Sequence, residues 1–128
     1  YQARLSFADD CRRVALPSYL APFADGFDLL GDGQLIAVPL PGHSAGQLGL
    51  FIPDGNGRPW LFAADACWNL PAAREGRLPS WLAMRIQDDP ATYRATFAGL
   101  GRIARQEPAV AIQPSHCLTT WQQLRDEP

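Results

Sequence analysis

Short apolar runs separated by glycine-rich turns occupy residues 27–66, and they restrict the folds that this chain can adopt. Residues 27–30 and 34–40 flank Gly31-Asp32-Gly33, a pattern that predicts a hairpin because glycine tolerates the positive φ of tight turns. Residues 47–52 and 60–66 flank a second turn rich in Gly, Asn and Asp. We therefore expect a sheet whose strands are mainly antiparallel.

The strongest helix signal follows this region and begins at Asp89-Pro90. Asp89 is a favourable N-cap, and Pro90 would occupy the first helical position, where its missing N–H costs nothing. Pro108 should end the helix. Apolar residues recur between them at spacings of four, three and four, which places them on one buried face: Tyr93, Phe97, Leu100 and Ala104.

The remaining segments give weaker signals. Residues 8–22 suggest one short helix followed by a loop, and residues 69–88 suggest a long loop with about one helical turn. Residues 109–113 predict a short strand, and apolar residues at 118, 121 and 124 predict a terminal helix of about two turns. We expect one α/β domain of the α+β type over residues 1–128, with helices flanking the sheet.

Composition excludes several classes of partner. The 128 residues are 47% hydrophobic and carry a formal net charge of −2, with the charges scattered, so we expect neither nucleic acid nor a membrane as a partner. No apolar run approaches the roughly 20 residues that span a bilayer. The odd count of three cysteines argues against a disulfide framework and favours a cytoplasmic location.

Three polar side chains lie where predicted strands end. His43 and His116, the two histidines of the chain, follow strands in loops where a rigid sheet presents functional groups. Asp65 ends the apolar run 60–66, where a buried carboxylate is costly unless it is paired or binds metal. Two imidazoles and one carboxylate suit zinc. The alternative is structural: surface or capping histidines, and an aspartate that caps a helix or loop.

The sequence around each of these residues resembles a known family. Residues 38–47, Val-Pro-Leu-Pro-Gly-His-Ser-Ala-Gly-Gln, are similar to the segment of the metallo-β-lactamase superfamily that carries its third metal-binding histidine. Residues 61–66, Leu-Phe-Ala-Ala-Asp-Ala, resemble the strand that ends in the family's metal-bridging aspartate. Gln-Pro-Ser-His at 113–116 resembles the late loop with its last histidine. The motifs occur in the family's order and cover about residues 27–117.

This resemblance implies the C-terminal half of an αββα sandwich, in which two sheets face each other and a dinuclear site lies at their shared edge. The metal would be zinc, with iron and manganese as the other candidates. His43 would bind one ion, His116 the other, and Asp65 would bridge them. The family's first motif, two histidines separated by one residue and followed by Asp-His, does not occur in this sequence. Since the chain begins at Tyr1 rather than Met, we expect a longer parent that supplies it.

The resemblance implies hydrolysis by the parent protein, since paired ions activate water and polarise a carbonyl or phosphoryl oxygen. The small-molecule substrate would contain an ester, lactone, thioester or related bond, and Asp65 is the candidate catalytic residue. A catalytic zinc normally has about three protein ligands, so we expect this chain alone to hold one ion or none and to be inactive. The alternative is a non-catalytic folded or interaction domain. A hydrolytic triad without metal would need Ser44 or Ser115 as its nucleophile.

Residues beside the motifs bear on substrate and ligands. Acyl-homoserine lactonases of the superfamily have a tyrosine three positions after the bridging aspartate, where this chain has Trp68, so we expect a departure from their lactone chemistry. Large apolar residues such as Trp81 and Met84 either border the site, which would favour an apolar acyl substrate, or cover the core. Cys67 or Cys117 would be a zinc-binding thiolate or a buried free cysteine.

Half of a sandwich would expose the sheet face that its other half covers. A large apolar face normally associates with a partner. We therefore expect this face to be covered by the N-terminal half of the fold or by a second copy of the chain in a homodimer.

Overall fold

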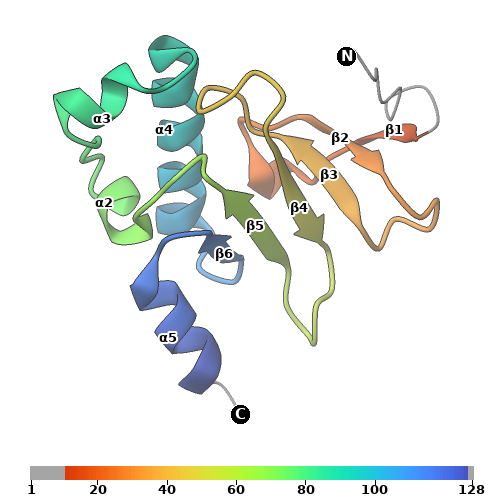
Figure 1. The fold of residues 1–128 in the computed structure, drawn as a ribbon. Coiled ribbons are helices and arrows are strands. Elements are labelled where there is room, and N and C mark those ends of the chain that lie inside the picture. Colours follow the sequence, from red (N-terminus) through yellow and green to blue (C-terminus); the bar gives the residue numbers. More distant parts are fainter. Residues whose placement is uncertain (1–10, 127–128) are drawn as a thin grey trace.

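A single six-stranded sheet organises the molecule, which a computed structural model describes over residues 11–126 (Figure 1). The strand order is β1-β2-β3-β4-β5-β6, and neighbours are antiparallel except β5 and β6, which are parallel. The strands are Arg12–Ala15 (β1), Asp25–Asp28 (β2), Ile36–Pro39 (β3), Leu48–Ile52 (β4), Trp60–Ala64 (β5) and Ala111–Pro114 (β6). The helices are the 3-10 turn Ser18–Leu20 (η1), Leu70–Arg74 (α2), Trp81–Arg85 (α3), Pro90–Gln106 (α4) and Leu118–Asp126 (α5). This mixed architecture confirms the predicted fold class.

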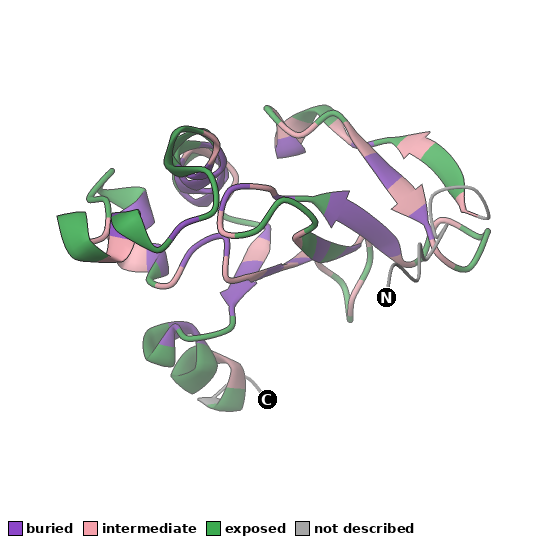
Figure 2. Ribbon diagram, turned by 45° about the horizontal axis from the view of Figure 1, so that its top comes forward, coloured by how far each residue is buried: buried purple, intermediate pink, exposed green. Residues whose placement is uncertain are grey.

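One face of the sheet is buried beneath α4. Cross-strand partners Ile36, Phe51, Leu61 and Ile112 form a continuous row on this face, and each is at most 6% exposed. The predicted apolar stripe of α4 belongs to the same buried cluster. Figure 1 shows α2, α3 and α4 grouped on one side of the sheet, and Figure 2 shows buried residues along α4 and the central strands. The hydrophobic core therefore lies between the sheet and α4.

The long helix begins and ends where the sequence predicts. Asp89 is the N-cap, and its carboxylate accepts hydrogen bonds from the backbone N–H groups of Ala91 and Thr92 at 3.0 and 3.1 Å. These bonds satisfy donors that a helix start otherwise leaves unpaired. The helix stops at Gln106, two positions before Pro108.

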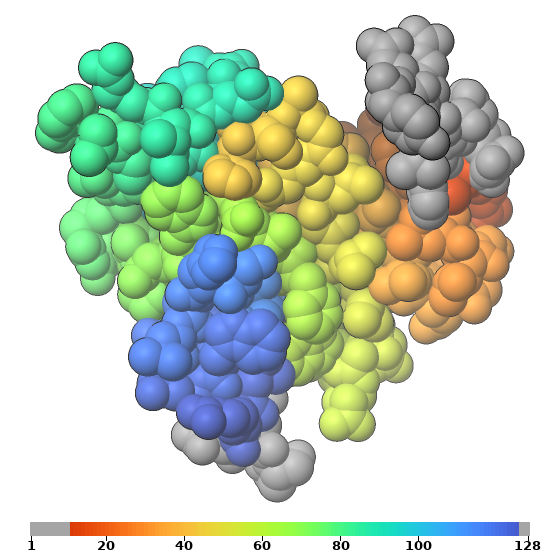
Figure 3. All heavy atoms as spheres, in the orientation of Figure 1, coloured from red at the N-terminus to blue at the C-terminus, as the bar shows by residue number. Residues whose placement is uncertain are grey.

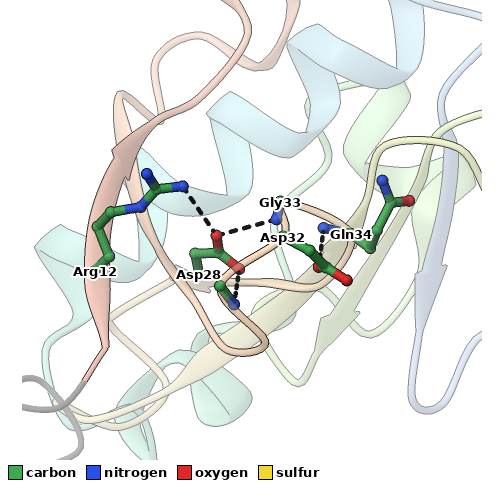
Figure 4. A network of polar contacts seen from close by, with 6 residues as sticks. Arg12, Asp28, Asp32, Gly33 and Gln34 are labelled. Atoms are coloured by element: carbon green, nitrogen blue, oxygen red, sulfur yellow. Dashed lines mark hydrogen bonds and ion pairs between the residues drawn. The ribbon is translucent and has the colours of Figure 1, made fainter.

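The predicted hairpin of residues 27–40 is also confirmed, as β2 and β3. Its turn closes around the buried Asp28, whose carboxylate accepts the backbone N–H groups of Gly31 and Gly33 at 2.9 and 3.0 Å (Figure 4). Both glycines have positive φ, 81° and 76°. Arg12 approaches the same carboxylate at 3.3 Å, so Asp28 joins the turn to β1.

The prediction of one short helix followed by a loop in residues 8–22 missed a strand. Residues 8–10 lie outside the described part of the chain, and residues 12–15 form an edge strand that pairs with β2. Ion pairs across this ladder, Arg12 with Asp28 and Arg13 with Asp25, support the pairing. Only Ser18–Leu20 forms a single 3-10 turn. The structure of this segment is determined by its cross-strand partners on β2, which are distant in sequence.

Residues 69–88 hold more helix than predicted. Asn69 caps α2 by accepting the N–H of Ala72 at 2.9 Å, and Ser80 caps α3 by accepting the N–H of Ala83 at 3.3 Å. Each helix spans five residues, so the segment contains two short helices where one turn was expected. Met84 is buried, as a core residue would be, whereas Trp81 is 72% exposed.

The opposite face of the sheet is less covered. Leu48 and Leu50 of β4 are 47% and 39% exposed, and Phe62, the partner of Leu50 on β5, is half-buried. Trp121 of α5 stands beside them, where a groove of about 200 Å³ is lined by residues of β4, β5 and α5. Apolar side chains therefore line the face that points away from the core. Within residues 11–126, no helix is both long and apolar enough to cross a membrane.

Candidate metal centre

The three candidate ligands meet at one edge of the sheet. Nε2 of His43 lies 3.7 Å from Oδ2 of Asp65, and Nε2 of His116 lies 3.2 Å from Oδ1. The side chains of His43 and Asp65 are about one-third exposed, whereas that of His116 is 69% exposed. Together with Trp68 they line an open pocket of about 500 Å³. Each oxygen of the central carboxylate thus faces a different imidazole.

Parallel pairing brings Asp65 and His116 together. Because β5 and β6 run in the same direction, the residues after them emerge at the same edge of the sheet. The backbone turns at once after β5, where Ala64 has a φ of 48°. Its carbonyl accepts the N–H of Ser115 at 3.0 Å, which joins the two loops directly. These contacts fix the spacing between the carboxylate and the second imidazole.

The loop that carries His43 is held by the start of α4. The N–H groups of Asp88 and Asp89 donate to the carbonyls of His43 and Gly42 at 3.2 and 3.0 Å. The buried hydroxyl of Thr96 donates to the carbonyl of Pro41 at 2.7 Å. Three hydrogen bonds therefore join this loop to α4 and to the two residues that precede it.

Gln87 is a contact that the sequence analysis missed. Its side chain is buried, and its Oε1 lies 3.0 Å from Nδ1 of His43. Its Nε2 donates to the carbonyl of Ala83 at 2.8 Å. A glutamine in an irregular segment carries no sequence signal of such a role, since only the packing of α3 against the site places it there.

The residues present fit a cation. Among residues 11–126, buried Oδ1 of Asp65 accepts no hydrogen bond, and Nε2 of His116 lies 3.2 Å from it. A buried polar atom without a hydrogen bond is costly. Imidazole nitrogen and carboxylate oxygen are both zinc ligands. Within residues 11–126, no group of three or more His, Cys, Asp or Glu side chains is already arranged to hold a metal ion. His43, Asp65 and His116 therefore bring suitable ligand atoms to one place, and further ligands or a small rearrangement would complete a metal site.

The two cysteines that are close in sequence to Asp65 and His116 behave as core residues. Cys67 and Cys117 are free, buried and part of the hydrophobic cluster, and neither lines the pocket. Burial raises the pKa of the Cys67 thiol to about 12. Burial also acts to raise the pKa of Cys117, but hydrogen bonds from Leu70, Thr120 and Thr119 outweigh it and leave that pKa below its usual value. The structure favours the buried-cysteine interpretation over the thiolate ligand.

The serine-based alternative finds no support in the geometry. Ser44 and Ser115 are exposed, and neither hydroxyl hydrogen-bonds to a histidine in the part of the chain that the structure describes.

Trp68 packs edge-to-face against His43 with the ring centroids 6.1 Å apart. Figure 3 shows the segments around residues 40–50, the segment after β5 and the C-terminal segment meeting on one face of the molecule.

Comparisons with known proteins find similarity to lactonases over part of the chain. The chain is 36% identical over 62 residues to the N-acyl homoserine lactonase AttM of Rhizobium radiobacter and 34% identical over 62 residues to that of Agrobacterium fabrum. Each match covers 48% of this chain and 24% of the relative, so the matched segment spans about a quarter of the relatives' length. No family model matches the chain.

A solved structure supports the same fold. This is an N-acyl homoserine lactone hydrolase with the product N-hexanoyl-L-homoserine at its catalytic metal centre, matched with a TM-score of 0.53 at 21% identity. The match covers 70% of this chain and 33% of that protein. At this identity the likeness concerns the fold. The six-stranded sheet with flanking helices therefore matches a metallo-β-lactamase-like lactonase fold over part of the chain, which confirms the resemblance seen in the sequence.

Proposed function

We propose that this chain, which has a lactonase-like fold, serves in metal-dependent hydrolysis. His43, Asp65 and His116 would supply part of the metal site. The observation that carries the proposal is the convergence of two imidazole Nε2 atoms on the two oxygens of one carboxylate. Asp65 lies between the histidines, so it is the residue that would bridge two ions. His43 would bind one and His116 the other.

The roles of the chain's own residues follow from their positions. A bound divalent ion supplies Lewis-acid catalysis, in which it activates water and polarises the oxygen of the bond to be cleaved. Asp65 and the two histidines hold the charge at the edge of the sheet, with the carboxylate anchored by the joined loops after β5 and β6. Trp68 lines the pocket and packs edge-to-face against the His43 imidazole, so it would help to hold that ring in place.

We propose a lactone or related ester as the substrate class, since the sequence relatives are named N-acyl homoserine lactonases. A second groove, of about 390 Å³, shares Trp68 with the site pocket and continues past Leu78, Pro79 and Phe97. Its lining is mixed: Leu78, Pro79 and Phe97 offer apolar contacts for an acyl chain, while Asn69, Arg77 and Ser80 offer polar ones. Trp68 stands where acyl-homoserine lactonases of the superfamily have a tyrosine, so this side of the pocket lacks the phenol hydroxyl of those enzymes.

The uncovered face of the sheet bears on activity. We propose that it is covered in the functional protein by polypeptide equivalent to the part of the lactonase structure that this chain does not match, about two-thirds of that protein. The exposed Leu48, Leu50 and Trp121 would be buried there. Sedimentation of the full chain tests this. The proposal is supported if the chain is a monomer that gains mass when that polypeptide is added and if these residues then become less accessible to solvent. A stable homodimer would instead assign the face to a second copy.

The metal proposal is tested by zinc titration of the full chain, with competition against a coloured chelator. His43→Ala, Asp65→Asn and His116→Ala should each reduce zinc affinity by at least about 10-fold, because each removes a ligand. Asp54→Asn is the matched control, since Asp54 is an exposed carboxylate in the turn before β5, at the opposite end of that strand. Equal zinc binding by all four variants would overturn the proposal.

A second reading is a non-catalytic domain of the same fold, favoured by the absence of a ready metal cluster within residues 11–126. The two hypotheses predict different results when the zinc-loaded protein, with its covering polypeptide present, is mixed with an acyl homoserine lactone. A hydrolase should open the lactone ring, whereas a non-catalytic domain should not. Zinc binding without acid release from the lactone would favour a non-catalytic domain or another ester class.

A further inference from the structure

The amide of Gln87 can take only one orientation in this structure. Its Nε2 lies 2.8 Å from the carbonyl of Ala83, a group that only accepts hydrogen bonds. The amide nitrogen must therefore face Ala83, and the amide oxygen must face His43. Gln87 is 5% exposed, so water does not compete for either contact.

This orientation decides which nitrogen of His43 carries the proton. Oε1 of Gln87 is an acceptor, so Nδ1 of His43, 3.0 Å away, must be the donor. In the neutral imidazole the other nitrogen, Nε2, is then left without a proton. The hydrogen bond made by one ring nitrogen determines what the other can bind.

The unprotonated Nε2 points at an anion. It lies 3.7 Å from Oδ2 of Asp65, so two acceptors face each other across the pocket edge. That arrangement is unfavourable unless a cation lies between them. Trp68, packed edge-to-face on the same imidazole, restricts rotation of the ring away from this direction.

We propose that Gln87 is a positioning residue that holds His43 as its Nδ1–H tautomer and so presents the Nε2 lone pair to a metal ion. The inference rests on the proposed metal site, but the tautomer itself exists without metal. Gln87 follows α3, so it couples the packing of that helix to the site. Residues that orient a ligand in this way typically change metal affinity by about 10- to 100-fold when they are removed.

The test uses the full chain labelled with ¹⁵N in histidine. Long-range ¹H–¹⁵N spectra at mildly alkaline pH report which ring nitrogen is protonated, and His116→Ala identifies the His43 signals. The metal-free wild type should show His43 as the Nδ1–H tautomer. Gln87→Met, which keeps the length of the side chain but removes the acceptor, should lose this preference and bind zinc about 10- to 100-fold more weakly.

Thr96→Val is the matched control for a merely structural effect. It removes the 2.7 Å hydrogen bond that holds the same loop but leaves the imidazole contact intact, so the tautomer should not change. The inference is overturned if metal-free wild type shows His43 protonated at Nε2, or if Gln87→Met keeps the wild-type tautomer. Failure of the wild type to bind zinc even with its covering polypeptide present would instead refute the proposed function, while the spectra still decide the role of Gln87.

Discussion

Gly42, the residue before His43, is the position where a single methyl group should damage the site most. Its φ is 127°, and a Cβ built there would lie 2.4 Å from both the N and Cα atoms of Tyr93. Ordinary contact begins at 3.4 Å, so the loop or α4 must move by about 1 Å. Backbone strain of this kind costs about 1–3 kcal/mol. Relieving the overlap costs a further ~1–3 kcal/mol, so Gly42→Ala should lose at least ~2 kcal/mol of unfolding free energy.

The same displacement moves the adjacent imidazole, so zinc affinity should fall by at least about 10-fold. Gly46→Ala is the matched control in the same loop, because no atom of the described residues lies within 4 Å of its Cβ position and its φ is outside the left-handed region. Urea unfolding followed by circular dichroism measures stability, and chelator competition measures affinity. If Gly42→Ala unfolds at the same urea concentration as Gly46→Ala, the close approach of this loop to α4 is not as described.

Three further predictions concern the fold. Phe51→Ala should cost about 3–5 kcal/mol of unfolding free energy, because Phe51 is fully buried. Leu50→Ala should cost under about 1 kcal/mol, because Leu50, the next residue in the strand, is partly exposed on the other face. Equal losses in urea unfolding would contradict the assignment of the two sheet faces. Burial acts to raise the pKa of Asp28, but hydrogen bonds from backbone N–H groups and Arg12 outweigh it, so the folded pKa lies below the ordinary 3.8. The stabilisation from the ionised Asp28 is thus present above pH 3.8 and lost as the pH falls through the folded pKa. In Asp28→Asn, the free energy of unfolding, measured at a series of pH values, should therefore fall less steeply with acid than in the wild type. Cys67, buried and with a pKa of about 12, should resist iodoacetamide until the chain unfolds, while the half-buried Cys11 reacts first; mass spectrometry with Cys11→Ser as reference would expose any early labelling of Cys67.

Local signals made the hairpin and the long helix predictable from sequence. The turn at residues 31–33 needs positive φ at two glycines, and the Asp89-Pro90 pair supplies a cap and a helix start, so each element is specified by neighbouring residues. The edge strand Arg12–Ala15 was missed because its partners lie on β2, beyond the reach of a local pattern. The helices after β5 were underestimated because each spans only five residues and depends on a single cap and on packing.

The candidate site was predictable only where it carried motifs. His43, Asp65 and His116 stand in segments similar to those of a known family, and the structure brings them together. Gln87 was not predictable, because a buried glutamine acquires meaning only from the atom that it faces. The contact between Gly42 and Tyr93 was likewise invisible, since it joins two elements that meet only in the folded chain.

The parallel pairing of β5 and β6 has a kinetic consequence. Antiparallel neighbours from β1 to β5 are joined by short connections and can form from local encounters, whereas Trp60 can meet Ala111 only after the three intervening helices have folded back. Closing so long a stretch of chain is entropically slow. We therefore expect His43 and Asp65 to be neighbours early in folding and His116 to arrive last, so that the capacity to bind a metal ion reports completion of the whole fold.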